Sequence, residues 1–316
     1  MCTYNGAAYV REQLDSIAQQ RRLPDTMIIV DDCSRDETLC ILREFACMAP
    51  FPVEVIANES NLGYVKNFEK AIGLATGDVI VLSDQDDIWM PQKLAGTEKV
   101  FVEHPDADLV FSDALLVDEQ RRVFAYGLWE SIEFDLRERR LIEMGEAFKV
   151  LLRRNVVTGA TMAFRSSLTS RLLPMPEVWV HDEWIAILVA ATGNIRLLSE
   201  KLIEYRQHGK NLIGARKPSF QEKIRLLFTS REGFYKELFL KTGLLRARLS
   251  EPACFPVPKT VIEELDKKLD HLAVRTKLPH SRMFRLGPVV REIVCGRYLR
   301  YSSGWKSVVR DLFEPM

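Results

Sequence analysis

A short apolar run that ends in a cluster of acids is the feature that most constrains this chain. Residues 79–82 (VIVL) are all apolar, which is typical of a strand buried on both faces of a sheet. Asp84, Asp86 and Asp87 follow closely. In an open α/β sheet, ligands bind beyond the carboxyl ends of the strands, where these acids would lie. We therefore expect residues 77–89 to form the ligand-binding end of a central strand.

Three neighbouring carboxylates repel one another and raise each other's pKa unless a cation lies among them. Oxygen ligands at a rigid strand end suit Mg²⁺ or Mn²⁺, whose shell is usually completed by substrate phosphate oxygens. The pattern therefore predicts a divalent metal and a nucleoside diphosphate. A calcium EF-hand is excluded, because the loop lacks the Gly and the closing Glu that such a site needs. An acidic surface turn and a phosphoaspartyl site remain open from this spacing alone.

Cysteine usage and hydropathy bear on where the protein works. The six cysteines are scattered and include no CxxC pair, which argues against a zinc site and a disulfide framework and favours a reducing compartment. The longest apolar run, residues 184–191, is too short to cross a bilayer, and no signal peptide is recognisable. We expect a cytoplasmic protein that folds as one large domain or two smaller ones.

The formal net charge of zero conceals an asymmetry along the chain. Residues 1–200 contain 20 Lys/Arg and 32 Asp/Glu, whereas residues 201–316 contain 24 and 12. Residues 281–316 also interleave basic and apolar positions, which is typical of a helix that lies on a membrane surface. Packing of this segment against the first domain, or attraction between the two halves, explains the same pattern.

Strand and helix patterns alternate up to about residue 105. Helical spacing covers residues 7–19, 65–75 and 91–103, and strands are predicted at 27–30 and 52–57 in addition to 79–82. Ser34 and Glu37 form a capping-box pattern that opens a further helix, to about residue 46. Such alternation predicts a parallel sheet with right-handed crossovers. No strand pattern precedes the turn at residues 3–6, so we expect the first strand to be missing, through truncation or a start placed too late.

Beyond residue 105 the alternation weakens. Strands are predicted at residues 109–111, 115–117 and 195–205, and helices at 141–152 and 185–191. Residues 155–164 are predicted as a strand around Gly159, and a glycine inside a strand often marks close approach of a ligand. After Lys217 and Pro218 only helical spacing recurs, in residues 220–249, 261–272 and 283–301. The predicted domains are residues 1–215, of α/β class, and a helical region at 216–316.

Five motifs, taken together and in order, resemble those of family 2 glycosyltransferases with the GT-A fold. They are CTYNG (2–6), VDDCS (30–34), NLG (61–63), SDQDD (83–87) and HDEW (181–184). The motifs SDQDDIW, HDEW and the later YRQHG (205–209) are most similar to those of the bacterial rhamnosyltransferase-like branch. The resemblance covers residues 1 to about 215. It implies a Rossmann-like, mostly parallel sheet flanked by helices, followed by a C-terminal helical region.

The resemblance implies a nucleotide pocket near the start of the chain. Asp32 would accept a hydrogen bond from the imide N–H of a uracil or thymine ring. Thr3, Tyr4 and Asn5 would line the same base and ribose pocket. By residue type alone, Asp31 or Asp32 is also a plain cap for the following helix.

The resemblance also implies roles for the acid cluster and the YRQHG segment. Asp86 would bind the metal that bridges the donor's α- and β-phosphates, with Asp84 nearer the ribose and Asp87 supporting them. His208 would be a further metal or diphosphate ligand, and Arg206 would contact the same phosphates. A lone histidine in a loop is often simply solvated.

Asp182 is the candidate general base, because sugar transfer needs a carboxylate that takes the proton of the acceptor hydroxyl. Its position at a predicted helix start would favour the ionised form, and would equally explain it as a helix cap. Glu183 is the rival base. Trp184 would stack on a sugar ring or belong to the core. Thr158 and Gly159 are candidates for the border of the acceptor site.

Together these features predict a metal-dependent glycosyltransferase, and the resemblance alone implies that it inverts the anomeric centre. The expected donor is a dTDP- or UDP-sugar, with dTDP-rhamnose preferred. The expected acceptor is a polysaccharide or polyprenyl-linked glycan at the inner membrane face, and no nucleic-acid partner is expected. The alternatives are a UDP-hexose donor, a nucleotidyltransferase or phosphatase, and a non-catalytic nucleotide-sugar-binding protein. A nucleotidyltransferase would need a basic residue in its phosphate loop, which residues 5–8 (NGAA) lack.

Overall fold

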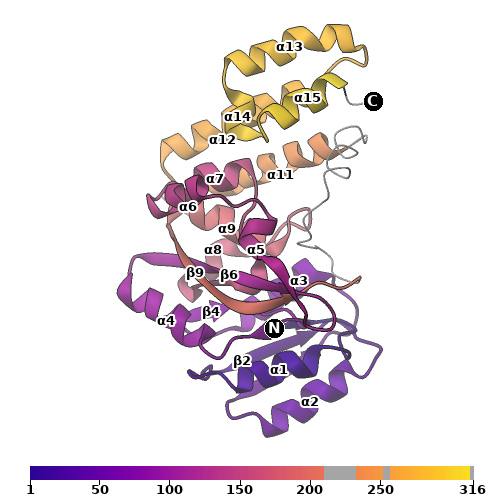
Figure 1. Cartoon of the computed structure of the whole chain (residues 1–316), viewed down its shortest axis with the longest axis vertical. Coiled ribbons are helices and arrows are strands. Elements are labelled where there is room, and N and C mark those ends of the chain that lie inside the picture. Colours follow the sequence, from indigo (N-terminus) through magenta and orange to yellow (C-terminus); the bar gives the residue numbers. More distant parts are fainter. Residues whose placement is uncertain (210–232, 252–256, 314–316) are drawn as a thin grey trace. The chain divides into compact units, whose positions relative to one another are not determined.

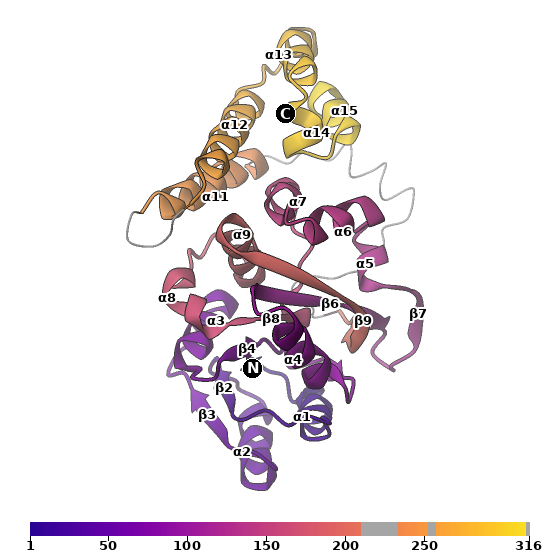
Figure 2. The same ribbon diagram turned by 90° about the vertical axis from the view of Figure 1, so that its left-hand side faces the viewer.

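The computed structural model describes residues 1–209, 233–251 and 257–313 (Figures 1 and 2). Within these residues the chain forms two compact units. The first contains residues 1–145 and 156–209, and the second contains residues 146–155 together with the described residues from 233 onward. The expected boundary near residue 216 lies outside the described residues, so the division at that point stays a prediction.

The first unit begins with three parallel strands that alternate with helices. The strands are β1 (Cys2–Thr3), β2 (Met27–Asp31) and β3 (Val53–Ala57), paired in the order β1-β2-β3. The helices are α1 (Val10–Ala18), α2 (Thr38–Met48) and α3 (Tyr64–Leu74). Helix α1 packs on α2, and α3 packs on β2 (Figure 1). The register places Thr3 beside Asp31, so β1 and β2 present polar residues at the same edge.

The second sheet of this unit is mixed. Its strands are β4 (Val79–Val81), β5 (Ile88–Trp89), β6 (Ala107–Val117), β7 (Val123–Gly127), β8 (Met162–Arg165) and β9 (Asn194–Arg206). Their order is β4-β8-β6-β9-β5, and β7 pairs with β6. Strands β6 and β9 run parallel, side by side in Figure 2, whereas β4, β5 and β7 each pair antiparallel. A mostly parallel arrangement therefore holds for the first sheet only, because an apolar run does not encode the direction of its partner.

The remaining helices of the first unit are α4 (Lys93–Glu103), α5 (Leu128–Ser131), α6 (Leu136–Glu143), α8 (Thr169–Leu172) and α9 (His181–Thr192). The single helix predicted at 141–152 is in fact α6 followed by α7 (Ala147–Arg153), because Gly145 adopts a φ of 81° between them. The strand predicted at 155–164 is also shorter, since Gly159–Thr161 form a 3₁₀ turn. The predicted capping box is wrong, because α2 begins at Thr38 without a side-chain cap.

A cavity of about 380 Å³ lies beside the short strand β1. It is lined by Met1, by the first residues of β2, by β4, and by apolar side chains of α3 and α4. The N-terminal ammonium of Met1 donates to the Ile28 carbonyl at 2.7 Å, and burial lowers its pKa. The acids of residues 84–87 do not line this cavity, so it is separate from the candidate site.

The second unit is helical over the described residues. Besides α7, it contains α11 (Phe234–Leu249), α12 (Lys259–Thr276), α13 (Arg282–Val294), α14 (Arg297–Tyr301) and α15 (Trp305–Phe313). A buried ion pair joins α12 to α15, where Arg275 Nε lies 2.7 Å from Asp311 Oδ2. The helical spacing predicted for residues 261–272 and 283–301 is confirmed, and residues 220–232 lie outside the described residues. None of the described helices combines the length and the apolar character needed to span a membrane.

Candidate active site

The acid cluster occupies the loop between β4 and β5, as predicted. Asp87 is buried, and its Oδ1 accepts a hydrogen bond from the backbone N–H of Arg206 at 3.1 Å. Its Oδ2 has no hydrogen-bond partner among the described residues. Burial, and then the charges of Asp86 and Asp84, raise the pKa of Asp87 well above its usual range. A buried carboxylate with an unsatisfied oxygen is a place where a cation or a proton is needed.

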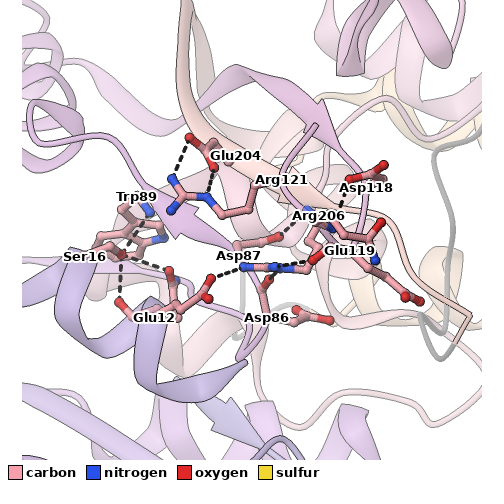
Figure 3. A network of polar contacts seen from close by, with 12 residues as sticks. Glu12, Ser16, Asp86, Asp87, Trp89, Asp118, Glu119, Arg121, Glu204 and Arg206 are labelled. Carbon is pink, nitrogen blue, oxygen red and sulfur yellow. Dashed lines mark hydrogen bonds and ion pairs between the residues drawn. The ribbon is translucent and has the colours of Figure 1, made fainter. Parts of the chain in front are cut away.

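Arg206, the last residue of β9, holds this loop in position (Figure 3). Its guanidinium donates to the Asp86 carbonyl at 2.9 Å, the Glu119 carbonyl at 3.1 Å and the Glu12 carboxylate at 2.5 Å. It also lies 4.9 Å from the centre of the Tyr9 ring. These contacts hold the Arg206 guanidinium against the acid loop, and its expected contact with donor phosphates stays a prediction.

The two residues predicted as metal ligands are brought together. Nε2 of His208 lies 2.8 Å from Oδ2 of Asp86, and the imidazole stacks on Tyr9 with 4.7 Å between ring centres. A carboxylate oxygen and an imidazole nitrogen are both suitable ligands for Mn²⁺. Among the residues that the structure describes, no group of three or more His, Cys, Asp or Glu side chains is arranged to hold a metal. The pair therefore fits a Mg²⁺ or Mn²⁺ ion that takes its other ligands from substrate phosphates and water.

Asp84 connects the acid loop to the candidate base. Burial raises the pKa of Asp84 to about 7, and the charges of Asp86 and Asp182 add to the effect. Asp84 and Asp182 are far apart in the sequence, but one short segment, residues 159–162, contacts both regions. Its Met162 carbonyl accepts the N–H of Leu82 at 3.1 Å, and its Gly159 N–H donates to Asp182 at 2.8 Å. The structure thus places the predicted phosphate-binding acids and the predicted base in one region.

Tyr205 is a site residue that the sequence analysis missed. It lies on β9 and is almost fully buried. Its pKa is raised well above the usual range by burial and then by the charges of Asp87, Asp84, Asp86 and Asp182. One phenol therefore lies within electrostatic reach of both the acid loop and the base. Its place in the YRQHG segment, next to Arg206, was the available signal.

Asp182 stands in the first turn of α9, as predicted. Its Oδ2 accepts a hydrogen bond from the Gly159 N–H at 2.8 Å, and its Oδ1 accepts one from the Glu183 N–H at 2.6 Å. Burial raises the pKa of Asp182 to about 6, although these backbone donors act in the opposite direction. A carboxylate that is fixed in direction and titrates just below neutral pH is suited to general-base chemistry.

Gly159 lies so close to α9 that a side chain would not fit. A Cβ at this position would be 2.8 Å from Nε2 of His181 and 3.4 Å from Cβ of Asp182. His181 is buried and stacks on Phe68 at 3.9 Å between ring centres, and burial lowers its pKa to about 3. The glycine is predicted to mark close approach of a ligand, but the group that approaches it in the structure is α9. The Thr158 carbonyl accepts a hydrogen bond within the same turn. The proposed place of Thr158 at the border of the acceptor site stays a prediction.

The predicted nucleotide pocket is partly used by the protein itself. Thr3 is buried and donates its hydroxyl to Asp31 at 2.8 Å. The Asp32 carboxylate accepts the backbone N–H groups of Leu62 at 2.7 Å and Gly63 at 2.9 Å. Asp32 therefore holds the NLG turn in place, which leaves fewer acceptor positions for a base. The alternative that Asp32 caps the following helix is wrong, since its carboxylate bonds Asn58, Leu62 and Gly63 and not the first turn of α2.

Gln85, inside the acid loop, joins this loop to the turn at residues 3–6. Its side-chain amide accepts the Tyr4 N–H at 2.8 Å and donates to the Tyr4 carbonyl at 3.1 Å. A Cβ on Gly6 would lie 2.2 Å from Oε1 of Gln85, so a larger residue there would displace the Gln85 side chain. Asn5 accepts the Arg35 N–H at 2.8 Å, whereas the Tyr4 side chain stays exposed. Gln85 stands within SDQDD, but unlike Tyr4 and Asn5 it is not among the residues predicted for the site.

Trp184 belongs to the core, so the alternative in which it stacks on a sugar ring is corrected. It is 1% exposed, its Nε1 donates to the Leu172 carbonyl at 2.9 Å, and its ring lies 5.5 Å from that of Trp179. The physical reason is helical periodicity, because residues two apart on a helix do not share a face. With Asp182 directed to the site, Trp184 points elsewhere.

Lys93 is a buried cation near the acids that the sequence analysis also missed. Its Nζ donates to the Ala160 carbonyl at 3.1 Å and lies 4.9 Å from the centre of the Trp89 ring. Burial lowers the pKa of Lys93 to about 8, although the charges of Asp87 and Asp84 raise it. A lysine at a helix start looks like a surface residue, and nothing in the local sequence signals its burial.

Two curated relatives are similar to this chain. An uncharacterized protein of Mycobacterium tuberculosis is 29% identical over 212 residues, which cover 66% of this chain and 58% of that protein. The dTDP-rhamnosyl transferase RfbG of Shigella flexneri is 26% identical over 256 residues, which cover 75% of this chain and 81% of RfbG. The chain thus spans less than two thirds of the length of the mycobacterial relative.

Two solved structures share the fold at low sequence identity. S. aureus TarS 1–349 in complex with UDP-GlcNAc has a TM-score of 0.58 and 17% identity, covering 98% of this chain and 88% of the 1–349 chain. The mannosyltransferase PcManGT of Pyrobaculum calidifontis, in complex with GDP-Man and Mn²⁺, has a TM-score of 0.53 and 18% identity, covering 98% and 83%. These likenesses confirm the predicted GT-A fold. The family model for glycosyl transferase family 2 matches residues 1–170, more than half of the sequence, and this chain therefore belongs to that family.

Proposed function

We propose that this protein is a metal-dependent, inverting glycosyltransferase that moves a sugar from a nucleoside-diphosphate donor to a hydroxyl group of a glycan. The observation that carries the proposal is that residues 159–162 contact both candidate groups: the Met162 carbonyl accepts the N–H of Leu82, just before the acid loop, and the Gly159 N–H donates to Asp182. Donor phosphates at the acid loop and an acceptor hydroxyl at Asp182 would meet in one place. The inverting outcome rests on the family resemblance alone.

Asp86 and His208 are the proposed protein ligands of the metal. When bound, Mg²⁺ or Mn²⁺ supplies positive charge that offsets the charge developing on the departing diphosphate. Arg206 keeps the backbone of Asp86 in place, and stacking on Tyr9 holds the His208 ring. The Mn²⁺ in the PcManGT complex supports the same choice of ion.

Asp182 is the proposed general base. It takes the proton of the acceptor hydroxyl while that oxygen forms its bond to the anomeric carbon and the bond to the diphosphate breaks. With a pKa of about 6, the carboxylate is mostly ionised at neutral pH and still a competent proton acceptor. The N–H groups of Gly159 and Glu183 fix its direction, which lowers the cost of orienting it during the reaction.

The proposed donor is dTDP-rhamnose, and the similarity to RfbG supports this choice. A UDP-hexose is the alternative donor, because the structural neighbour TarS binds UDP-GlcNAc. The proposed acceptor is a polysaccharide or polyprenyl-linked glycan, with peripheral contact at the inner face of the cell membrane. The exposed Tyr4 ring is the proposed platform for the nucleotide base.

The test is a screen of nucleotide sugars for release of free nucleoside diphosphate. The purified chain is assayed with dTDP-rhamnose, UDP-GlcNAc, UDP-glucose and GDP-mannose, each with Mn²⁺ or with EDTA. We expect the highest release with dTDP-rhamnose, and loss of release with EDTA or in Asp86→Ala. Asp118→Ala is the matched control, because Asp118 is an acid in the same part of the structure (Figure 3). Its carboxylate pairs with Arg122.

Two outcomes would speak against the proposal. Full activity of Asp86→Ala in the presence of EDTA would remove the role of the metal. Calorimetric binding of a nucleotide sugar without any turnover would instead favour a non-catalytic nucleotide-sugar-binding protein.

A further inference from the structure

Helix α13 has a buried face formed by Arg285, Val289 and Glu292, and an exposed face that is largely apolar. The buried face packs into the second unit through Val289, and Ile293 packs against the same cluster. The other buried members of this cluster are Leu278, Tyr298 and Val308. Some of the apolar residues of the segment 281–316 therefore belong to an ordinary helical core, and others stay exposed.

The opposite side of α13 is apolar and uncovered. We call Met283, Phe284, Leu286, Val290 and Val294 the outer face of α13; all five are exposed, with Met283 at 80% and Val294 at 81%. At 3.6 residues per turn, Met283, Val290 and Val294 fall on one line along the helix. A helix that only needs to pack against its own domain carries polar residues on this side.

The exposed charges that the described residues 281–313 themselves carry have one sign. The only acids in the described residues 281–313 are Glu292 and Asp311, and both are buried. Glu292 pairs with His271 at 2.6 Å, and Asp311 pairs with Arg275 at 2.7 Å. The exposed charged residues of this segment are Arg282, Arg291, Arg300 and Lys306. The described surface of α13, α14 and α15 therefore offers apolar and cationic groups and no exposed carboxylate.

We propose that the outer face of α13 docks onto an anionic lipid bilayer. Its apolar side chains would enter the boundary between headgroups and acyl chains, and the neighbouring basic residues would meet headgroup phosphates. A second copy of this chain is a poorer occupant, because pairing two such faces would bring cationic residues together. The inference deepens the proposed function and rests on it in one respect, because a polyprenyl-linked acceptor would lie at the same membrane surface.

The experiment is co-sedimentation of the full chain with lipid vesicles. Vesicles of phosphatidylcholine alone are compared with vesicles that also contain phosphatidylglycerol, at low and at high salt. We expect binding to the anionic vesicles that weakens with salt, and at least tenfold weaker binding for the double variant Met283→Asp with Val294→Asp. The matched control is Val102→Asp with Met144→Asp, which introduces the same charges at apolar positions that are 71% and 75% exposed in the first unit.

A second variant, Arg282→Gln with Arg291→Gln, tests the charge without changing the apolar residues, and we expect it to weaken the salt dependence. Equal binding by the outer-face variant and its control would overturn the inference, as would absence of binding to anionic vesicles. A dimer in solution that Met283→Asp with Val294→Asp converts to monomer would also overturn it, by assigning the face to a second copy. Donor binding in vesicle-free buffer is measured in parallel, so a failure of the transferase proposal is seen separately.

Discussion

Oδ2 of Asp182 lies 2.8 Å from the backbone nitrogen of Gly159, a residue that has no room for a side chain. The direction of the candidate base is thus set by a turn 23 positions earlier in the chain. This turn is a 3₁₀ segment rather than the strand that its apolar residues predict. The relationship has a direct consequence for catalysis, because small displacements of a base cost rate.

Gly159→Ala should lower kcat by roughly 10- to 100-fold while leaving donor KM nearly unchanged. The added Cβ would lie 2.8 Å from Nε2 of His181, so the turn and α9 must separate and the hydrogen bond to Asp182 must lengthen. Steady-state kinetics of diphosphate release measure the effect. The control is Gly96→Ala in α4, where a Cβ would meet Leu198 at an ordinary 3.8 Å. Wild-type kcat in Gly159→Ala would show that the turn does not position the base.

The pH dependence of kcat/KM should show an acid limb with a midpoint near pH 6. The pKa of Asp182 is raised to about 6 by burial, and a general base is active only when deprotonated, so the rate falls as the pH drops through this value. Asp182→Asn should lose about 10²- to 10⁴-fold in rate, together with the acid limb. Glu183→Gln serves as the comparison and should keep both. The reverse result would identify Glu183 as the base.

Asp182→Asn should also change how stability depends on pH. In the wild type, the carboxyl has a pKa of about 6 when folded against an ordinary 3.8, so the folded state binds the proton more tightly. The free energy of unfolding of the wild type therefore falls as the pH rises from about 4 to about 6, by on the order of 2–3 kcal/mol from this group. Urea denaturation at pH 4, 5, 6 and 7 should show the variant gaining on the wild type across this range. A pH-independent difference between them would contradict burial of the charge.

Arg206→Gln should destabilise the protein more than Arg121→Gln, although each arginine pairs with a glutamate (Figure 3). The Arg206 side chain is 3% exposed, and its removal leaves the Asp86 and Glu119 carbonyls without this donor. We expect Arg206→Gln to lower the free energy of unfolding by about 2 kcal/mol. The effect is smaller than for a fully buried ion pair, because the partner Glu12 is half exposed. The exposed pair of Arg121 with Glu204 should contribute about 0–1 kcal/mol.

The same two variants separate a positioning role from a purely structural one. Because Arg206 donates to the Asp86 carbonyl, Arg206→Gln should raise the Mn²⁺ concentration needed for half-maximal rate, whereas Arg121→Gln should not. An unchanged Mn²⁺ requirement in Arg206→Gln would limit the role of this residue to stability.

Local patterns in the sequence were sufficient to locate the acid loop and the helix that carries Asp182. Both depend on residues that are close in the chain: an apolar run followed by acids, and an acid at the start of a helical period. The motifs were likewise enough to identify the family, which the match over residues 1–170 confirms. The strands β2 and β3 were also predicted within a residue or two. Strand β2 is a largely buried apolar run, whereas β3 is half-exposed and was recognised from its valine and isoleucine residues.

What the chain alone did not determine depends on contacts between distant segments. The antiparallel pairing of β4 with β8 and the placement of Arg206 against the acid loop both result from strand partners that no local pattern encodes. Burial then changed the chemistry, since only the packed structure gives Asp84 and Asp182 their raised pKa values. The sequence determined which groups are available, whereas the tertiary structure determined which of them face one another, because desolvation and charge coupling exist only between groups that folding brings together.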